Sequence, residues 1–294
     1  MVPLLLNHHF SSPNSSSNLF SNRTVFSRDS ISLVSPLNKP QFHRRTSRVR
    51  HMAALQDGVA TVAVMAGAYT LVYTFDKLTQ RQIIKQKLSR KIVHILSGVL
   101  FMSSWPLFSS SAEARYYAAI VPLLNCARLV IYGTRFLKDE ALIKSVTREG
   151  NPEELLRGPL YYVIVLFFSV LVFWRDSPVG LVALAMMSGG DGFADIIGRM
   201  YGSTKLPYNR NKSWIGSISM FVSGFLFSIG ILYYFSIFGY LHFAWDEAIV
   251  KVALVSFVAT LVESLPITEV LDDNISVPIA SMCTALLVFG SGSS

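Results

Sequence analysis

Long apolar runs separated by short polar segments make up most of the chain from Asp57 onward. A helix needs about 17 to 25 apolar residues to cross a bilayer, and most of the runs are near that length. They predict membrane spans near residues 57–75, 92–108, 115–133, 159–174, 179–198, 214–238, 248–265 and 275–290. The first run has few large aliphatic residues in its opening half. The expected fold is therefore all-α, a polytopic transmembrane helical bundle of seven to eight spans.

The composition agrees with a membrane protein whose charge lies outside the spans. Of the 294 residues, 51% are hydrophobic and 15% are charged, which is too apolar for an ordinary soluble domain. When the loops are assigned alternately to two sides, one side carries fifteen Lys and Arg residues, and the other carries Arg175 alone. This asymmetry supports the predicted order of spans. Because the net charge of +8 comes from the leader and the loops, no nucleic-acid partner is expected.

Residues 1–54 differ from the rest of the chain. They are rich in Ser and Arg and contain a single acidic residue, Asp29. This is the composition of an organelle transit peptide, and it lacks the long apolar core of a secretory signal. We therefore expect a disordered transit peptide, cleaved near residues 50–54, before one membrane domain over residues 55–294. An uncleaved disordered tail is the alternative, and composition alone leaves plastid and mitochondrion open.

The segment 188–217 places chemically active residues in an apolar background. Asp191 and Asp195 lie at or near membrane depth, where a charge is costly and usually functional. On a helix they share one face, with side-chain bases roughly 6 Å apart. A shared divalent cation would remove their repulsion, and oxygen ligands of this kind suit Mg²⁺. The pair therefore predicts a Mg²⁺ site that also binds phosphate.

Glycines and cations in the same segment extend this prediction to a nucleotide site. The glycines would let a large anion approach the backbone, and the cations would hold a triphosphate. The predicted nucleotide-binding residues here are Gly190, Asp191, Gly192, Asp195, Arg199, Lys205, Lys212, Ser213, Gly216 and Ser217. No P-loop pattern occurs, so a soluble-type nucleotide fold is not expected. The alternative is that the glycines pack helices and the basic loop sets membrane orientation.

Residues 190–207, Gly-Asp-Gly-Phe-Ala-Asp-Ile-Ile-Gly-Arg and onward to Leu-Pro, together with Asn-Lys-Ser-Trp-Ile-Gly-Ser at 211–217, resemble the polyprenol kinase family of membrane enzymes. The likeness continues through residues 89–94, 156–162, 262–266 and 272–274. The family includes dolichol, farnesol and phytol kinases, with the CDP-diacylglycerol synthases as more distant relatives. The resemblance is greatest to plant plastid members, which implies a chloroplast membrane, the envelope in preference to the thylakoid.

The resemblance implies that CTP phosphorylates a long-chain isoprenoid alcohol, with phytol as the acceptor and phytyl phosphate entering tocopherol biosynthesis. Phosphoryl transfer requires alignment and neutralisation of phosphate charge. The predicted catalytic residues are Lys91, His94, Asp191, Glu263 and Asp273, and Arg90 joins the nucleotide site. Asp191 and Asp195 would hold Mg²⁺, while His94, Glu263 or Asp273 would orient or deprotonate the alcohol. The alternatives are interfacial anchoring by the basic residues near 90 and helix N-capping near 273.

The expected partners are an isoprenoid alcohol from the bilayer, a nucleoside triphosphate from the stroma, and membrane lipids, with the oligomeric state left open. Three alternatives stay beside this hypothesis: a farnesol or geranylgeraniol kinase, a cytidylyltransferase like the CDP-diacylglycerol synthases, and a membrane transporter. A transporter can also carry buried acids in broken helices. The predicted layout gathers the motifs on one side of the membrane, which argues against a continuous transport path.

Overall fold

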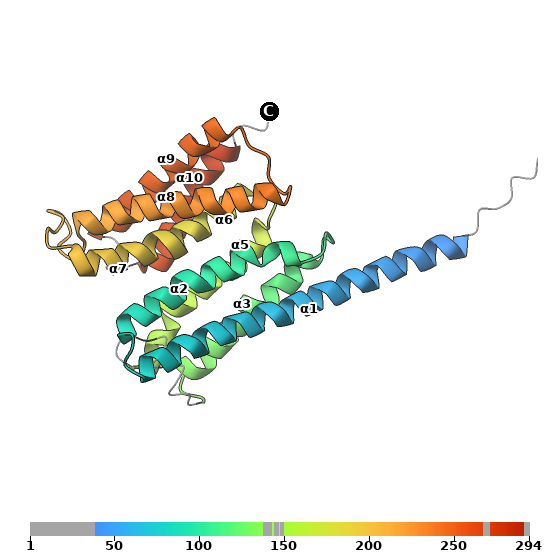
Figure 1. Cartoon of the computed structure of the whole chain (residues 1–294), viewed down its shortest axis with the longest axis horizontal. Helices are drawn as coiled ribbons and strands as arrows, with labels where there is room; N and C mark the ends of the chain where they lie inside the picture. Colours follow the sequence, from blue (N-terminus) through green and yellow to red (C-terminus); the bar gives the residue numbers. More distant parts are fainter. Residues whose placement is uncertain (1–38, 138–142, 144–146, 148–149, 267–270, 291–294) are drawn as a thin grey trace, which may run out of the picture. The chain divides into compact units, whose positions relative to one another are not determined.

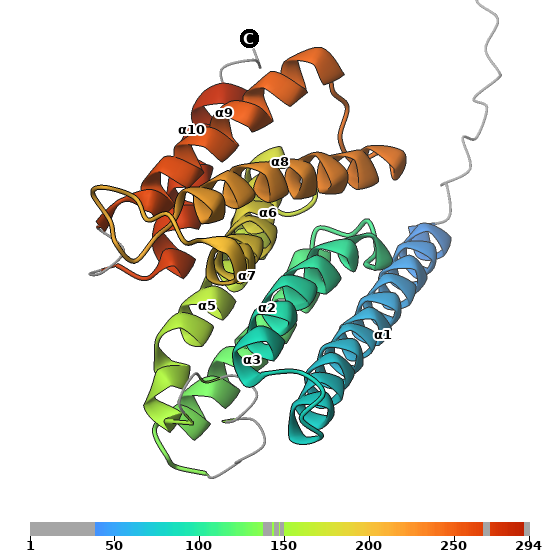
Figure 2. The same ribbon diagram turned by 60° about the vertical axis from the view of Figure 1, so that its left-hand side comes forward.

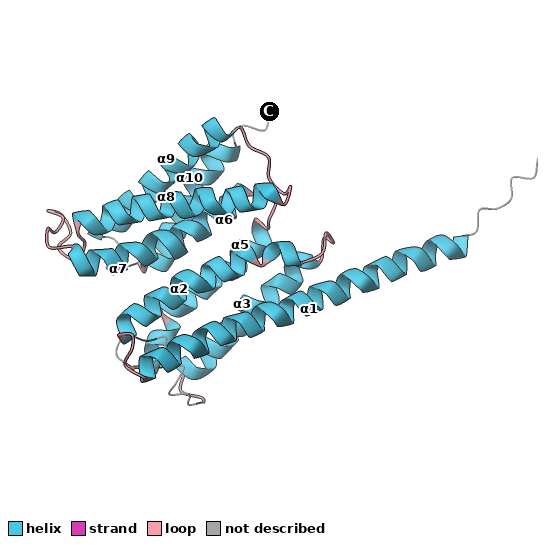
Figure 3. Cartoon of the chain, viewed as in Figure 1, coloured by secondary structure: helices cyan, strands magenta, loops and turns pink. Residues whose placement is uncertain are grey.

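The computed structural model describes residues 39–137, 143, 147, 150–266 and 271–290, and the elements within these residues are helices (Figures 1 and 3). The α-helices are α1 (Lys39–Gln80), α2 (Gln86–Ser103), α3 (Ala114–Gly133), α5 (Gly158–Val172), α6 (Pro178–Ala185), α7 (Asp191–Tyr201), α8 (Trp214–Ile237), α9 (Trp245–Ser264) and α10 (Asp273–Gly290). Short 3₁₀ segments cover Trp105–Leu107 and Pro152–Leu156, and a π-helical segment, Met186–Gly190, joins α6 to α7. The predicted all-α class is confirmed.

The chain divides into two compact units, Met1–His43 and Arg44–Ser294. Most of the predicted transit peptide, residues 1–54, lies outside the described residues. Helix α1 begins at Lys39, before the predicted boundary at residue 54. The helices that form the site described below belong to the second unit.

Six helical stretches of the described residues are long and apolar enough to cross a membrane. They are Arg50–Gln80, Ala114–Gly133, Pro152–Val172, Pro178–Tyr201, Trp214–Ile237 and Asp273–Gly290. Helices α2 and α9 stand where the other two spans were predicted, but α2 opens with several basic residues and α9 carries acids near both ends. The predicted count of seven to eight spans is therefore not confirmed.

The segment from Pro178 to Tyr201 is the most buried of these stretches and lies between α8 and α2 (Figure 2). Its first half is apolar on every side, a pattern typical of a buried helix. Leu181, Val182, Leu184 and Met187 accordingly have no exposed surface. This central segment carries Asp191 directly after its apolar half, so the carboxylate is held inside the bundle.

Glycines allow the neighbouring helices to approach this segment closely. A Cβ added to Gly98 of α2 would overlap Ser188 Oγ, and one added to Gly192 would overlap Ile95. Where α7 crosses α8, a Cβ on Gly198 would lie 3.3 Å from the Cα of Gly216. Small residues at such crossings are the usual means of close packing between membrane helices.

Buried polar contacts join the middle of α1 to the connections after α2 and after α5. Asp57 accepts hydrogen bonds from the backbone N–H of Ser109 at 2.6 Å and from its hydroxyl at 2.9 Å. Arg175 donates to the carbonyls of Trp105, Phe108 and Ser109. Buried charges are tolerated when they are hydrogen-bonded in this way. The network fixes the position of α1 at this end of the bundle.

Candidate active site

A polar cavity of about 300 Å³ lies where α2, α7, the α7–α8 loop and the start of α10 meet. Its lining residues are Arg90, Lys91, His94, Asp191, Asn209, Asn211, Lys212, Asp272, Asp273 and Asn274. The lining therefore includes three basic side chains and three carboxylates. Charges in and beside membrane helices are costly unless they are paired or functional, so this concentration marks the cavity as a candidate site.

Lys91 of α2 binds both of the aspartates predicted to hold a metal. Its ammonium lies 2.9 Å from Asp191 Oδ2 and 4.0 Å from Asp195 Oδ2. Asp191 is buried, whereas Asp195, one turn later, is more exposed and pairs with Arg199 at 2.8 Å. The four-residue spacing thus places both carboxylates beside one cation, which in this structure is the Lys91 ammonium.

Lys212, in the loop before α8, pairs with acids from two other helices. Its ammonium donates to Glu263 Oε1 and, at 2.9 Å, to Asp273 Oδ2. Burial alone would lower the pKa of Lys212, but the negative charges of Glu263 and Asp273 outweigh burial and raise this pKa above its ordinary value. Lys212 therefore carries a positive charge at neutral pH, as a phosphate-binding cation must.

Three buried oxygen atoms near Lys212 accept no hydrogen bond from the described residues: Glu263 Oε2, Asp273 Oδ1 and Asn274 Oδ1. An unsatisfied buried acceptor costs about 1–3 kcal/mol, so several together call for a partner such as a bound cation or hydroxyl group. Within the described part of the chain, no three His, Cys, Asp or Glu side chains form a ready-made metal cluster. Sites that bind Mg²⁺ with phosphate need only one or two carboxylates, and Asp191 and Asp273 line the same cavity. The residues present thus fit Mg²⁺ bound together with a triphosphate.

The π-helical segment fixes the orientation of His94. The backbone N–H of Asp191 donates to the carbonyl of Met186, five residues back, instead of to the carbonyl of Met187. The Met187 carbonyl oxygen lies 3.0 Å from His94 Nε2. Because a carbonyl can only accept, Nε2 carries the proton, and the neutral ring keeps its acceptor lone pair on Nδ1. A local irregularity of one helix therefore sets the tautomer of a residue on another.

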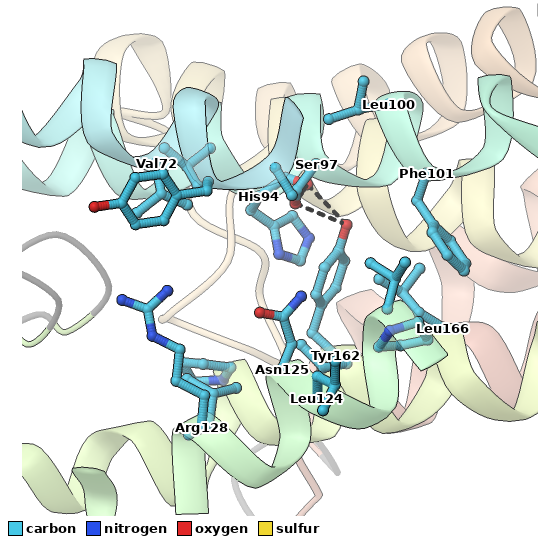
Figure 4. Close-up of a pocket in the computed structure, with 18 of the residues that line it drawn as sticks. Val72, His94, Ser97, Leu100, Phe101, Leu124, Asn125, Arg128, Tyr162 and Leu166 are labelled. Atoms are coloured by element: carbon cyan, nitrogen blue, oxygen red, sulfur yellow. Dashed lines mark hydrogen bonds between the residues drawn. The ribbon is translucent and has the colours of Figure 1, made fainter. Parts of the chain in front are cut away.

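A second, largely apolar cavity of about 450 Å³ is bounded by α1, α2, α3 and α5 (Figure 4). Its apolar walls include Val64, Ala68, Phe101, Val121, Leu129 and Leu166. Arg90, His94 and Asn274 line this cavity and the polar one. The two cavities therefore meet at these three side chains, one basic, one imidazole and one amide.

Polar side chains also project into the apolar cavity. The Tyr162 ring packs against the His94 ring at a tilt of 43°, with 4.2 Å between centroids, and the Tyr162 hydroxyl donates to the His94 backbone carbonyl at 2.9 Å. The same hydroxyl lies 3.3 Å from Ser97 Oγ. Asn125 and Arg128 extend from α3 into the cavity (Figure 4). The apolar cavity is therefore lined by these polar side chains in addition to the three that it shares with the polar cavity.

The structure brings together six of the predicted site residues on the polar cavity: Arg90, Lys91, His94, Asp191, Lys212 and Asp273. Glu263 does not line the cavity and contacts it through its ion pair with Lys212. Asp195 is joined through Lys91. Residues from α2, α7, the α7–α8 loop, α9 and α10 thus converge, although they are far apart along the chain.

The other predicted nucleotide-binding residues lie outside the cavity lining. Arg199 pairs with Asp195, and Lys205 is exposed. Ser213 caps α8 by accepting a hydrogen bond from Gly216 N–H at 3.2 Å. Ser217 Oγ is buried and has no partner among the described residues. Gly190, Gly192 and Gly216 contact neighbouring helices, which matches the packing alternative for glycines in membrane helices.

Sequence reasoning missed Asn209 and Asn211 as lining residues, and for residues 272–274 it left helix capping and a role in the site as equal alternatives. The backbone N–H of Asn274 does donate to Asp272 Oδ1 at 2.9 Å, so Asp272 is the cap of α10. This leaves Asp273 to pair with Lys212. The two asparagines were a usable signal, because they are neutral hydrogen-bonding residues within three positions of Lys212, a predicted phosphate-binding residue.

Comparison with known proteins identifies close relatives. A maize protein named "Probable phytol kinase, chloroplastic" is 68% identical over 239 residues, covering 81% of this chain and 79% of that protein. Phytol kinase 1, chloroplastic, of Arabidopsis thaliana is 60% identical over 245 residues, covering 83% and 81%. A soybean protein named "Probable phytol kinase 3, chloroplastic" is 41% identical over 244 residues, covering 83% and 76%. No family model and no solved structure matches the chain.

Proposed function

The chain belongs to the chloroplastic phytol kinase family, and from this premise we propose that it phosphorylates phytol at the junction of its two cavities. The apolar cavity holds the isoprenoid chain, and the polar cavity holds the triphosphate. The observation that carries this proposal is that both cavities share Arg90, His94 and Asn274. An alcohol whose tail lies in the apolar cavity therefore presents its hydroxyl group to the polar one.

The cations of the polar cavity bind the phosphates. Lys91 lies on α2 and Lys212 in the loop before α8. Asp191 holds Lys91 and Asp273 holds Lys212, each at 2.9 Å. Such fixed positive charges stabilise the charge on a transferring phosphoryl group without reorganising during the reaction. Mg²⁺ held by Asp191 and Asp273 would neutralise further phosphate charge. We assign Asp273 in place of Asp195 because Asp195 lies outside the cavity lining and is bound by Arg199.

His94 is the proposed proton acceptor. Its Nε2–H donates to Met187, so Nδ1 accepts the hydroxyl proton of the alcohol. The alcohol oxygen forms a bond to the γ-phosphorus as the bond from that phosphorus to the bridging oxygen of the donor breaks. The nucleoside diphosphate leaves, and the proton stays on His94 until solvent removes it. Asn274, which also lines both cavities, positions the hydroxyl group.

The donor is proposed to be CTP and the product to be phytyl phosphate used in tocopherol biosynthesis, as the family resemblance implies. We further propose that the polar cavity faces the stroma and that the protein lies in the envelope membrane. The support for the orientation is the concentration of Lys and Arg on one side when the loops are assigned by the eight-span order predicted from the sequence. Protease accessibility of the α7–α8 loop in intact plastids and in separated envelope and thylakoid fractions tests both statements.

The test of function is phosphate transfer by the purified protein in detergent. Phytol, farnesol and geranylgeraniol are each offered with CTP, UTP, GTP or ATP in the presence of Mg²⁺. We expect phytyl phosphate and CDP as the fastest-formed products. Release of pyrophosphate with CMP retained on a lipid would instead identify a cytidylyltransferase. Folded protein that forms no phosphorylated alcohol with any pair would refute the kinase proposal.

A further inference from the structure

Helix α1 is fastened to the bundle near its middle and near its C-terminal end, and the stretch between these points forms one wall of the apolar cavity. Near the middle, the hydroxyl of Thr61 donates to the Tyr117 carbonyl at 3.1 Å, close to the buried contacts of Asp57. Near the C-terminal end, the hydroxyl of Ser89 donates to the Phe75 carbonyl at 3.4 Å. The stretch between these points meets the cavity through side chains of Val64, Met65, Ala68, Tyr69 and Val72.

The lining residues of α1 and α3 show where the cavity opens. Deep in the cavity, Phe101 and Leu166 are 5% and 6% exposed. Met65 and Tyr69 of α1 line the same cavity and are 38% and 61% exposed, and Leu124 of α3 is 45% exposed. Residues that line a cavity while remaining this exposed lie at its mouth. The mouth is therefore between α1 and α3.

Lipid chains would surround this mouth, because α1 and α3 are both long and apolar enough to cross a membrane. An isoprenoid alcohol dissolves in the bilayer and would reach such an opening without passing through water. Ala68 stands in the α1 wall with Val64 and Val72 one turn away on either side. The small side chain of Ala68 leaves space in the cavity that a valine or an aromatic side chain at this position would fill.

We propose that the opening between α1 and α3 is the entrance for the isoprenoid alcohol and that Ala68 is a specificity-determining residue for its chain. The methyl group of Ala68 leaves the width that a long methyl-branched chain needs beside Phe101 and Leu166. This inference rests on the proposed kinase function. It adds the route of the acceptor and a residue that selects among acceptors.

The first experiment compares Ala68→Phe with Ala63→Phe, a matched control on the exposed side of the same helix that does not line the cavity. A phenylalanine side chain at position 68 would occupy part of the cavity that the alcohol chain needs, so Ala68→Phe is expected to lower kcat/KM for phytol about tenfold or more. Turnover of the short alcohol prenol and the KM for CTP should stay within about twofold of the unmodified protein, which also reports correct folding. Ala68→Val should give a smaller loss in the same direction and carries the comparison if the phenylalanine variant does not fold.

The second experiment needs no variant. A phytol analogue with a photoactivatable diazirine midway along its chain is expected to label residues 62–74 and 121–129, on the facing sides of α1 and α3. Labelling confined to α8 or α9 would overturn the proposed entrance. Equal phytol kinetics in Ala68→Phe and Ala63→Phe would overturn the role of Ala68. An unmodified protein that phosphorylates no alcohol would count against the proposed function itself, and is distinguishable from both of these results.

Discussion

Replacing Asp191 by Asn tests the metal assignment, because the change removes the charge and keeps the shape. Asp191 is 4% exposed, and its Oδ2 accepts a hydrogen bond from Lys91 at 2.9 Å. Asparagine can still accept that bond with its amide oxygen, but it is a poor ligand for Mg²⁺. Lys91 keeps the Asp195 carboxylate at 4.0 Å, so its charge is not left alone.

The expected losses differ between stability and activity. Exchanging a charge-assisted hydrogen bond for a neutral one costs about 1–2 kcal/mol, and the lower desolvation cost of the amide offsets part of it. A group that stabilises transferring phosphate is worth about 2.7–4 kcal/mol in the transition state, or 10²- to 10³-fold in rate. Asp191→Asn should therefore unfold at nearly the temperature of the unmodified protein while kcat falls by two to three orders of magnitude.

The assay measures the initial rate of phytyl phosphate formation against free Mg²⁺, with thermal unfolding in detergent measured alongside. Asp273→Asn should shift the Mg²⁺ requirement in the same direction as Asp191→Asn. Asp195→Asn is the matched control, since this acid lies outside the cavity lining, and it should shift that requirement much less. Normal turnover by Asp191→Asn at limiting Mg²⁺ would refute the metal role of Asp191. A larger effect at Asp195 than at Asp273 would restore the Asp191–Asp195 pair as the metal ligands.

Three further predictions follow from the geometry. His94→Gln should lower kcat about 10²- to 10⁴-fold with little change in the KM for phytol, and an unchanged kcat would exclude His94 as the base. Gly98→Ala should lower the unfolding temperature, because its Cβ would overlap Ser188 and lie 2.6 Å from the Tyr162 hydroxyl. The free energy of unfolding should fall by about 1–3 kcal/mol, and an unchanged unfolding temperature would contradict the close packing of Gly98. The pKa of Lys212 is raised in the folded state, so its stabilising contribution is complete below its ordinary pKa of about 10.4 and is lost only as pH rises through the higher folded value. The difference in unfolding temperature between Lys212→Met and the unmodified protein should therefore be at least as large at pH 9 as at pH 6, because the variant leaves the carboxylates of Glu263 and Asp273 without their cation. A difference that shrinks by pH 9 would contradict the raised pKa of Lys212.

Several features of the protein could be predicted from the sequence because they depend on local pattern. The apolar runs predicted helices, because a helix hydrogen-bonds the backbone N–H and C=O groups of a segment that is buried or crosses a bilayer, and few other structures do. The Gly-Asp-Gly-Phe-Ala-Asp segment identified the family, and the close relatives confirmed that identification. Asp191, Lys91 and His94 stood out because charged or titratable residues in an apolar background are costly. The cap at Asp272 was also foreseeable from residue type and position.

The partners of each site residue were decided by tertiary structure. Nothing in the spacing shows that Lys91 lies 2.9 Å from a carboxylate one hundred residues away, because such a pair depends on how two helices cross. The glycines of α7 and α8 were compatible with ligand binding or packing until the crossing itself placed them against each other.

The meeting of the two cavities is the clearest example of a feature that the sequence pattern does not predict. In the sequence, Asp191 and its neighbours predict an acidic, phosphate-binding site. The apolar cavity is formed by α1, α2, α3 and α5, and none of these helices carries the Asp191 motif. A hydrophobic pattern specifies which face of a helix is buried, but it does not specify whether facing side chains fill the space between helices or leave a cavity. The sequence by itself determined that this is a helical membrane protein of a recognisable family. Only the packing of its helices determined that Arg90, His94 and Asn274 line both the polar cavity and the apolar cavity. That arrangement depends on contacts between residues distant in the chain.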